Sequence, residues 1–486
     1  MENLKERTIR GGAAKFVAQA VTFSLRIGSL VVLSRLLEPK DFGLVGMVTA
    51  IVGVLNTFRD FGLSAATIQR ESVSEEQVST LFWVNLAVGA ILTILALAAG
   101  PVIAGFYHEP RLLAVNAVLS AAFLINAAGV QHSAQLHRQM RFTTLAAIEI
   151  IALVLSISVG IAMAAKGYGY WALVWTTLIV PLVSTSGAWL VTGWIPGMPH
   201  RNVGMGSMLR FGGTLTLNGL IVYVAYNLEK VLLGRFWGAE VLGLYGRAYQ
   251  LISIPTSNLN EAAGGVAFAA LSRVKNDPVR FKSYFLKGYS LVLALTVPVT
   301  MVCALFADDL IVVVLGPKWK NAVDVFRLLA PTILIFALIN PLSWLLISLG
   351  LVGRSLKVAL VLAPLVIGGY LIGLPYGPKG VAMAYSSVLA LWVVPHIAWC
   401  VHGTVVSLSD IGRALSKPFV SGLVAGAVAY VLVTFFGQYW TPLFRLVLGG
   451  AVFLSIYIWI LVYVMGQREF YLGLWRGLKP GPSVEA

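Results

Sequence analysis

Long apolar segments follow one another along almost the whole chain. A window of about 19 residues, enough to cross a bilayer as a helix, finds fourteen of them. Only 11% of the residues are charged and 58% are hydrophobic, whereas soluble domains carry about 25% charged residues. The sequence therefore predicts an all-α polytopic membrane protein. The predicted helices cover residues 13–33, 42–66, 80–105, 112–130, 143–165, 169–194, 209–233, 241–270, 284–306, 325–350, 356–374, 379–401, 415–436 and 443–465.

The distribution of Lys and Arg predicts the orientation of these helices. All connecting segments are short, the longest being residues 307–324 and 402–414. Nineteen Lys and Arg residues fall on the side of the N-terminus and nine on the opposite side. Because cytoplasmic loops collect Lys and Arg, both termini are expected in the cytoplasm. This bias accounts for most of the net charge of +15, so the charge gives no reason to expect a nucleic-acid partner.

An internal repeat appears when the chain is compared with itself at an offset of 200 residues. The stretch LSRLLEPKDFGLVGMV (33–48) aligns with LGRFWGAEVLGLYGRA (233–248). The offset predicts two six-helix lobes, residues 1–200 and 201–405, followed by two further helices and a cytoplasmic tail in residues 406–486. Six helices return the chain to its starting side, so the lobes share one orientation and a substrate site is expected between them. The matching pairs are Leu33/Leu233, Arg35/Arg235, Gly43/Gly243, Leu44/Leu244 and Gly46/Gly246.

Polar residues recur at helical spacing in three predicted helices. Steps of three and four residues place them on one face of each helix. Buried charges in a membrane are costly, so this face is expected to line a protein interior or a water-filled path. The faces comprise Lys15, Gln19, Thr22, Arg26 and Ser29 in the first helix, and Gly46, Thr49, Gly53, Asn56 and Asp60 in the second. An offset of 200 places Tyr249, Ser253, Thr256 and Asn260 at the positions that match Thr49, Gly53, Asn56 and Asp60.

The candidate site residues come from these helices. Among them, Arg26 and Arg59 are two positively charged side chains expected at different depths in the membrane, where each can contact an anionic group. A structural interpretation stands beside this one: Arg26 pairs with Asp60 across the first two helices, and Glu149 is a possible partner for Arg59. The candidate cavity residues are Gln19, Thr22, Arg26, Thr49, Asn56, Arg59, Tyr249, Ser253, Thr256 and Asn260. The candidates for a proton-coupling carboxyl group are Asp60, Glu229 and Glu261.

Enzymatic chemistry finds little support in the sequence. The longest outer segment contains adjacent Asp308 and Asp309 but no His and no second acidic group at ligand spacing. The six histidines are scattered, and the phosphate-binding pattern G-x-x-x-x-G-K-[ST] is absent, so an ATP-driven pump is excluded. We expect no enzyme activity, no bound metal and no cofactor; a proton or sodium gradient is the candidate driving force.

The opening of the chain resembles a known family. Residues 7–85, including SLRIGSLVVLSRLLEPKDFGLVGMVTAIVGVLNTFRDFGLSAATIQR, are similar to Wzx-type polysaccharide exporters of the WzxC-like branch. These belong to the multidrug/oligosaccharidyl-lipid/polysaccharide superfamily, and the resemblance implies a two-lobed, V-shaped fold that works by alternating access. It also implies a flippase of the bacterial inner membrane that moves undecaprenyl-diphosphate-linked oligosaccharides outward, in exopolysaccharide or lipopolysaccharide biosynthesis. It carries over no individual residue role.

The implied substrate agrees with the polar faces. A diphosphate is anionic and sugars need hydrogen bonds, so a cavity with a few fixed cations and many neutral polar groups suits such a cargo. Membrane lipids and the polysaccharide polymerase or export machinery are the other expected partners. One alternative is a cation-coupled multidrug exporter of the same superfamily, which would favour an acidic or aromatic cavity. Another is an integral-membrane glycosyltransferase or polymerase.

Overall fold

The computed structural model describes residues 2–59, 74–200, 220, 223–437, 439–469, 471 and 473. Side chains are described from residue 18 onward, without residues 258–263, 265, 266, 268, 269 and 352. The chain divides into two compact units, Met1–Gly246 and Arg247–Ala486, and each is described by itself. The lobe boundary expected at residues 200 and 201 lies beside residues outside the described part and stays a prediction.

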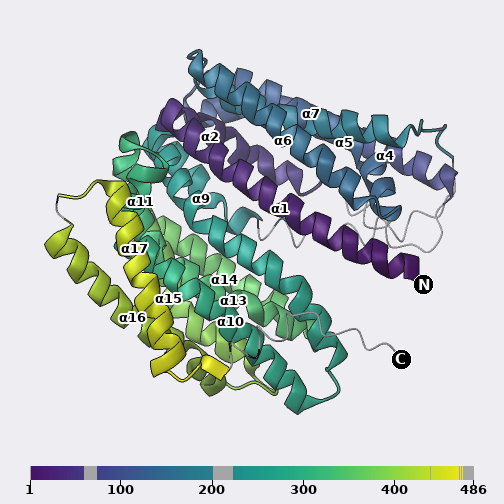
Figure 1. Cartoon of the computed structure of the whole chain (residues 1–486). Helices are drawn as coiled ribbons and strands as arrows, with labels where there is room; N and C mark the ends of the chain where they lie inside the picture. Colours follow the sequence, from purple (N-terminus) through teal and green to yellow (C-terminus); the bar gives the residue numbers. More distant parts are fainter. Residues whose placement is uncertain are drawn as a thin grey trace. The chain divides into compact units, whose positions relative to one another are not determined.

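Unit 1 (Met1–Gly246) is a bundle of long helices (Figure 1). Helix α5 packs against both α4 and α7, and α6 packs against α1 and α7. Helix α2 lies against α4, α5 and α7, so one of its faces is enclosed by the bundle. The helices are α1 (Glu2–Leu36), α2 (Pro39–Asn56), α4 (Glu75–Tyr107), α5 (Leu112–Arg138), α6 (Phe142–Ala165), α7 (Tyr170–Thr192) and the start of α9 (Leu228–Arg273).

Unit 2 (Arg247–Ala486) is also helical. Helix α10 packs against α13 and α16, α15 packs against α13 and α14, and α16 packs against α17. Its core gathers Phe285, Tyr289 and Trp344 with surrounding aliphatic side chains. Besides the rest of α9 it contains α10 (Pro278–Leu305), α11 (Ala307–Val314), η1 (Pro317–Ala322), α12 (Val323–Leu329), α13 (Pro331–Ser348), α14 (Val352–Gly373), η2 (Leu374–Tyr376), α15 (Gly377–Val401), α16 (Leu408–Phe436), α17 (Pro442–Trp459) and η3 (Ile460–Val464).

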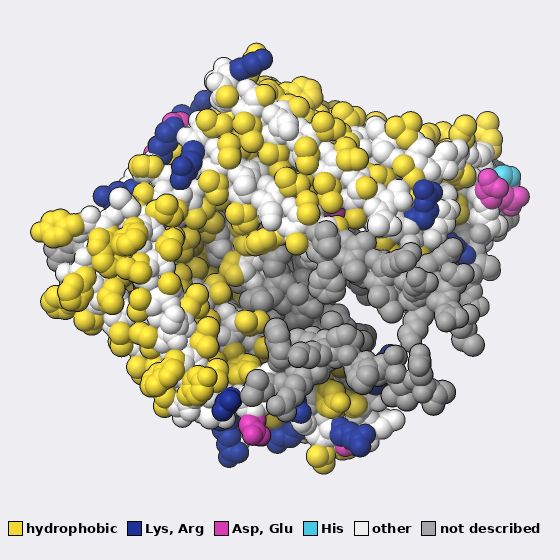
Figure 2. All heavy atoms as spheres, in the orientation of Figure 1, with side chains coloured by type: hydrophobic (Ala, Val, Ile, Leu, Met, Phe, Trp, Pro, Cys, Tyr) yellow, Lys and Arg dark blue, Asp and Glu magenta, His cyan; other side chains and the backbone are white. Residues whose placement is uncertain are grey.

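Nine helices of the described part are long and apolar enough to cross a membrane. On the face drawn in Figure 2, hydrophobic side chains cover most of the described surface, and Lys and Arg side chains gather in a few small groups. Large apolar side chains such as Val431 and Phe435 of α16 are exposed, as expected for contact with lipid. The prediction of an all-α polytopic membrane protein is confirmed, while the number of fourteen helices stays a prediction.

The segment between α10 and α13 is more ordered than the sequence predicted. The expected outer segment 307–324 forms α11 and η1, and the helix expected over 325–350 is divided into α12 and α13 at Pro331, which has no N–H to continue the helical bonding. Asp308 pairs with Arg327, and Asp309 pairs with Arg445 at 2.6 Å. Both carboxylates therefore hold this segment in place. Among the described residues no cluster of His, Cys, Asp or Glu could hold a metal ion.

Pro298 shows how the bundle accommodates a proline within a long helix. A proline removes the hydrogen bond to the carbonyl group four residues earlier, here that of Ala294 in α10. The hydroxyl group of Tyr457 in α17 donates to this carbonyl oxygen at 2.8 Å. Tyr457 is almost fully buried, so the bond satisfies two polar groups at once and fixes α17 against α10.

Two glycines bring α2 and α9 into direct backbone contact within unit 1. Helix α9 bends at Gly238, whose φ of 84° lies outside the helical region. A Cβ atom at Gly43 would lie 1.6 Å from the carbonyl oxygen of Ala239, and one at Gly243 would lie 1.8 Å from that of Pro39. The contact is reciprocal and joins matching positions of the repeat, since 39 and 43 differ from 239 and 243 by the same 200 residues.

The close approach of the two backbones predicts that alanine lowers the stability of the protein at Gly43 but not at Gly46, although both glycines lie on α2. Gly43→Ala forces α2 and α9 apart, and overpacking of this kind costs about 1–3 kcal/mol. We expect a drop in Tm of about 1–3 °C for the purified protein in detergent, because the entropy of unfolding of a chain this long is about 1 kcal/mol per kelvin. Gly46→Ala is the matched control, because its Cβ would meet only Leu242 Cδ2, at 3.5 Å, and should leave Tm unchanged or slightly higher. Equal Tm values for the two variants would contradict the backbone contact.

Candidate functional site

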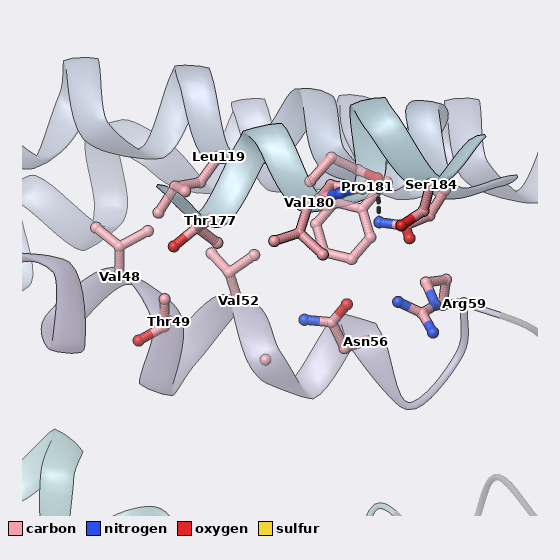
Figure 3. Close-up of a pocket in the computed structure, with 14 residues that line it drawn as sticks. Val48, Thr49, Val52, Asn56, Arg59, Leu119, Thr177, Val180, Pro181 and Ser184 are labelled. Carbon is pink, nitrogen blue, oxygen red and sulfur yellow. Dashed lines mark hydrogen bonds between the residues drawn. The ribbon is translucent and has the colours of Figure 1, made fainter. Parts of the chain in front are cut away.

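A cavity of about 300 Å³ lies within unit 1, between α2, α5 and α7 (Figure 3). Three of the predicted cavity residues line it: Thr49, Asn56 and Arg59. The remaining lining residues are Val48, Val52 and Gly53 from α2, Leu119, Ala122, Phe123 and Asn126 from α5, and Thr177, Val180, Pro181 and Ser184 from α7.

The start of α2 is fixed by its own sequence. Pro39 occupies the first turn, where its missing N–H costs nothing. The carboxylate of Asp41 accepts the backbone N–H of Glu38 at 3.0 Å, which completes a capping box. Further along the helix, Tyr223 donates to the carbonyl oxygens of Thr49 and Ala50 at 3.1 and 3.2 Å. Helix α2 is thus held in place along the stretch that lines the cavity.

The end of α2 differs from the prediction and brings Arg59 to the cavity. The sequence predicted one continuous helix over 42–66, but the helix ends at Asn56. The Thr57 hydroxyl bonds the carbonyl oxygen of Val54 at 2.7 Å, and the next backbone N–H groups turn to carbonyls three residues back. Short polar side chains compete in this way with helical bonding. Arg59 therefore stands on a turn at the end of the helix rather than inside it.

Helix α7 is fastened to α5 by side-chain donors. The Thr185 hydroxyl donates to the carbonyl oxygen of Ile125 at 2.9 Å, and the Trp189 indole donates to that of Ala128 at 2.8 Å. A Cβ atom at Gly129 would lie 2.5 Å from Thr185 Oγ1, so this position leaves no room for a side chain. These contacts fix the wall of the cavity that carries Thr177, Pro181 and Ser184.

The cavity carries one formal charge on its lining residues, the guanidinium of Arg59. No carboxylate lines it, and Arg59 has no acidic partner among the residues that the structure describes. The neighbouring polar groups are the amides of Asn56 and Asn126 and the hydroxyl of Ser184. A cation with unfilled donors beside neutral donors favours an anionic ligand with hydrogen-bonding groups.

Arg26 lies elsewhere in unit 1. It stands on α1 and pairs with Glu149 of α6 at 3.4 Å, with more than half of each side chain exposed. It does not line the cavity, and neither do Gln19, which is exposed, and Thr22, which is half-buried. The proposed pairing of Glu149 with Arg59 is wrong, because the packing of α6 on α1 places Glu149 beside Arg26. Asp60, the suggested partner of Arg26, lies outside the described residues.

The candidates from the second polar stripe stand on α9. The Ser253 and Thr256 hydroxyls bond carbonyl oxygens of their own helix, and Tyr249 stands near Tyr385. Thr256 also lines a cavity of about 10 Å³ in unit 2, with Thr296, Asn340 and Trp344. Glu229, at the start of α9 in unit 1, is 1% exposed. The side chains of Asn260 and Glu261 lie outside the described part.

Sequence reasoning missed the contribution of α5 and α7. It considered polar stripes in α1, α2 and α9 but not Asn126, the Asn near the middle of α5. The signal in α7 was also present: Thr177, Pro181 and Ser184 follow one another at steps of four and three, the spacing of one helical face. A search of every predicted helix for this spacing would have found them.

The cavity predicts where a small thiol reagent can react. Ser184→Cys changes one atom on the cavity wall, and we expect rapid modification by a small maleimide. Ser156→Cys is the matched control, because Ser156 of α6 is 3% exposed and bonds the carbonyl oxygen of Thr176 at 2.8 Å. Both variants are made in a background without Cys303 and Cys400. Equal labelling rates, measured by mass spectrometry, would contradict the described cavity.

Comparisons with known proteins agree with this fold. A family described as polysaccharide biosynthesis protein matches residues 32–324. The chain is 27% identical over 382 residues to the lipopolysaccharide biosynthesis protein WzxC of Escherichia coli, covering 76% of this chain and 77% of WzxC. It is 29% identical over 392 residues to the teichuronic acid biosynthesis protein TuaB of Bacillus subtilis, with the same shares covered.

Two other comparisons, with one further relative and with a solved structure, cover almost the whole chain. The succinoglycan biosynthesis transport protein ExoT of Rhizobium meliloti is 23% identical over 465 residues, which is 94% of each chain. The lipid II flippase MurJ in an inward closed conformation matches 95% of this chain and 100% of its own, with a TM-score of 0.74 and 13% identity. An inward-facing multidrug transporter of the MATE family matches 81% of this chain and 94% of its own, with a TM-score of 0.62 and 14% identity. The family match spans more than half of the sequence, and the chain belongs to the family of polysaccharide biosynthesis proteins.

Proposed function

We propose that this protein is a flippase that moves lipid-linked oligosaccharides across a membrane by alternating access. Its substrate class is the undecaprenyl-diphosphate-linked repeat unit of a bacterial exopolysaccharide or lipopolysaccharide. The protein is a multi-pass membrane protein of a polysaccharide biosynthesis family, and relatives along most of its length are named for polysaccharide biosynthesis or its transport step. A transport role for this chain is consistent with those names.

The observation that carries the proposal is Arg59 in its cavity. A diphosphate offers only hydrogen-bond acceptors, and guanidinium groups match phosphate geometry with paired donors. Arg59 stands beside two amides and a hydroxyl, and no described residue places a carboxylate on the cavity wall to neutralise it. The polyprenyl chain of such a substrate is apolar and can remain in the lipid while the polar head occupies the protein.

A multidrug exporter is the second candidate, because the fold is shared with a MATE-family transporter. Cationic drugs favour acidic or aromatic surroundings, whereas this cavity carries a cation and, among its lining residues, a single aromatic ring, Phe123. Proteoliposomes distinguish the two functions directly. We expect the purified protein to move a labelled lipid-linked sugar between leaflets and to leave a cationic dye in place.

The orientation and location follow from the charge bias and the substrate class. The excess of Lys and Arg on the side of the N-terminus supports cytoplasmic termini and a place in the bacterial inner membrane. With this orientation the substrate enters from the cytoplasmic leaflet, where such lipids are assembled, and leaves outward. Polysaccharide polymerase and export machinery would take over the released product.

Removal of the cation is the sharpest change to the site. Arg59→Gln keeps hydrogen-bonding capacity and approximate length but loses the charge, so we expect normal accumulation and at least a tenfold loss of export. Arg59→Lys should restore export only in part, because the paired donors are lost. Arg111→Gln is the control, since the exposed Arg111 bonds Glu109 outside the cavity. Export equal to wild type in Arg59→Gln would contradict the proposal.

Arg26 is tested together with its partner. If Arg26 contacts the substrate, the Arg26→Gln variant should lose export and the Glu149→Gln variant should keep it. Both variants should accumulate normally, because more than half of each side chain of the pair is exposed and such a pair adds little stability. If the role of Arg26 is structural, the two single variants fail alike and the double variant recovers. Export and protein abundance are measured in the same cells.

A coupling carboxyl group is the remaining part of the proposal. Burial favours the protonated form of a carboxyl group and a nearby Arg favours the charged form, so Asp60 could change protonation during the cycle. Asp60→Asn should then remove the dependence of transport on the proton gradient. Unchanged dependence in this variant would exclude Asp60 and leave Glu229 and Glu261 to be tested in the same way.

A further inference from the structure

The polar groups of the unit 1 cavity are divided between its two ends. Figure 3 shows Arg59, Asn56 and Ser184 together at one end, and Thr49 and Thr177 at the other. Val52 and Val180 lie between them. On each of the two helices, α2 and α7, seven residues separate the ends, so at a rise of 1.5 Å per residue the ends are about 10 Å apart.

The end that carries Arg59 is rich in donors. Arg59 has no acidic partner among the described residues, and no side-chain hydrogen bond occupies Asn56 or Ser184 within that part of the chain. The donors that the side chains lining this end carry are the guanidinium N–H groups, an amide NH₂ group and a hydroxyl. A group made only of acceptors, such as phosphate, satisfies this end.

The opposite end offers acceptors instead. The Thr49 hydroxyl donates its hydrogen to the carbonyl oxygen of Val45 at 3.0 Å, and the Thr177 hydroxyl donates to that of Leu173 at 2.9 Å. Each threonine oxygen is left as an acceptor. The backbone carbonyl of Thr177 is a third acceptor, because Pro181 has no N–H to bond it.

This arrangement fits a ligand with acceptors at one end and hydroxyl donors at the other. A sugar attached to phosphate has this pattern: the phosphate oxygens accept and the sugar hydroxyls donate. The cavity volume of about 300 Å³ is at the lower end for small-molecule sites. The space therefore suits one sugar ring with its phosphate rather than an oligosaccharide.

We propose that this cavity binds the sugar–phosphate junction of the lipid-linked substrate. The phosphate contacts Arg59, Asn56 and Ser184, and hydroxyl groups of the first sugar donate to Thr49 and Thr177. The inference rests on the proposed function and goes one step further, since it places selectivity for the first sugar on α2 and α7. The later sugars of the repeat unit remain outside this cavity.

The test compares the binding of three probes to the purified protein: undecaprenyl diphosphate, and the same lipid carrying one glucose or one galactose. We expect at least one sugar-bearing probe to bind more tightly than the sugar-free lipid. Thr177→Val removes an acceptor without changing the size of the side chain, and should weaken binding of the preferred sugar-bearing probe about three- to tenfold. It should leave the sugar-free lipid unaffected. Arg59→Gln should weaken all three probes by tenfold or more.

Thr176→Val is the matched control for Thr177→Val. The Thr176 hydroxyl also donates to the carbonyl oxygen of Leu173, at 2.7 Å, but its methyl group faces Gly160 of α6 and it does not line the cavity. We expect all three probes to bind this variant as they bind wild type. Thr49→Val gives a second test from α2 if Thr177→Val does not accumulate.

The outcomes separate this inference from the proposed function. Equal binding of sugar-bearing and sugar-free probes to wild type overturns the inference, as does a loss in Thr177→Val that is shared by all three probes. Both results leave the flippase function standing. Failure of every probe to bind wild type counts against the proposed function itself, and the inference falls with it.

Discussion

The central feature of unit 1 is the guanidinium group of Arg59, which is exposed at the end of α2, lines the cavity and has no acidic partner among the residues that the structure describes. Arg59 needs polar surroundings, because a cation in contact with lipid is costly. The turn after Asn56 directs it toward α5 and α7, where amides and hydroxyls rather than carboxylates form the wall. A carboxylate at that place would have made a structural ion pair. None of the described residues that line the cavity is a carboxylate, so within this part of the chain the donors of Arg59 are available to a ligand.

The position of Arg59 depends in turn on how α2 is held. Gly43 and Gly243 allow the backbones of α2 and α9 to touch, and Tyr223 bonds two carbonyl groups of α2. In the other helices that form the cavity, Thr185 and Trp189 of α7 bond carbonyl groups of α5. Apart from the glycine contact, each of these bonds joins a side-chain donor to a backbone carbonyl group, so the side chains of Tyr223, Thr185 and Trp189 fix the positions of the helices around the cavity.

The sequence predicted the fold class well, because a bilayer admits few structures for a chain with so many long apolar segments. It also predicted that Thr49, Gly53 and Asn56 share a face, since that follows from helical spacing alone. The partner of Glu149 could not be derived in this way. Pairing across helices depends on which helices pack together, and nothing in the spacing of α1 indicates that α6 is its neighbour. The early end of α2 at Asn56 was also not predicted. A hydropathy window averages over about 19 residues, whereas the bond from the Thr57 hydroxyl joins residues only three apart. The contribution of Asn126 and Ser184 was missed for a simpler reason, since polar spacing was sought in too few helices.

The most direct test of the account is to locate the bound sugar by photocrosslinking. A lipid-linked substrate with a photoreactive group on its first sugar would be bound by the purified protein, irradiated, and the adducts mapped by mass spectrometry. The account predicts adducts in the segments of α2, α5 and α7 that line the unit 1 cavity, reduced by an excess of unlabelled substrate. Adducts confined to unit 2, or unaffected by the competitor, would contradict it.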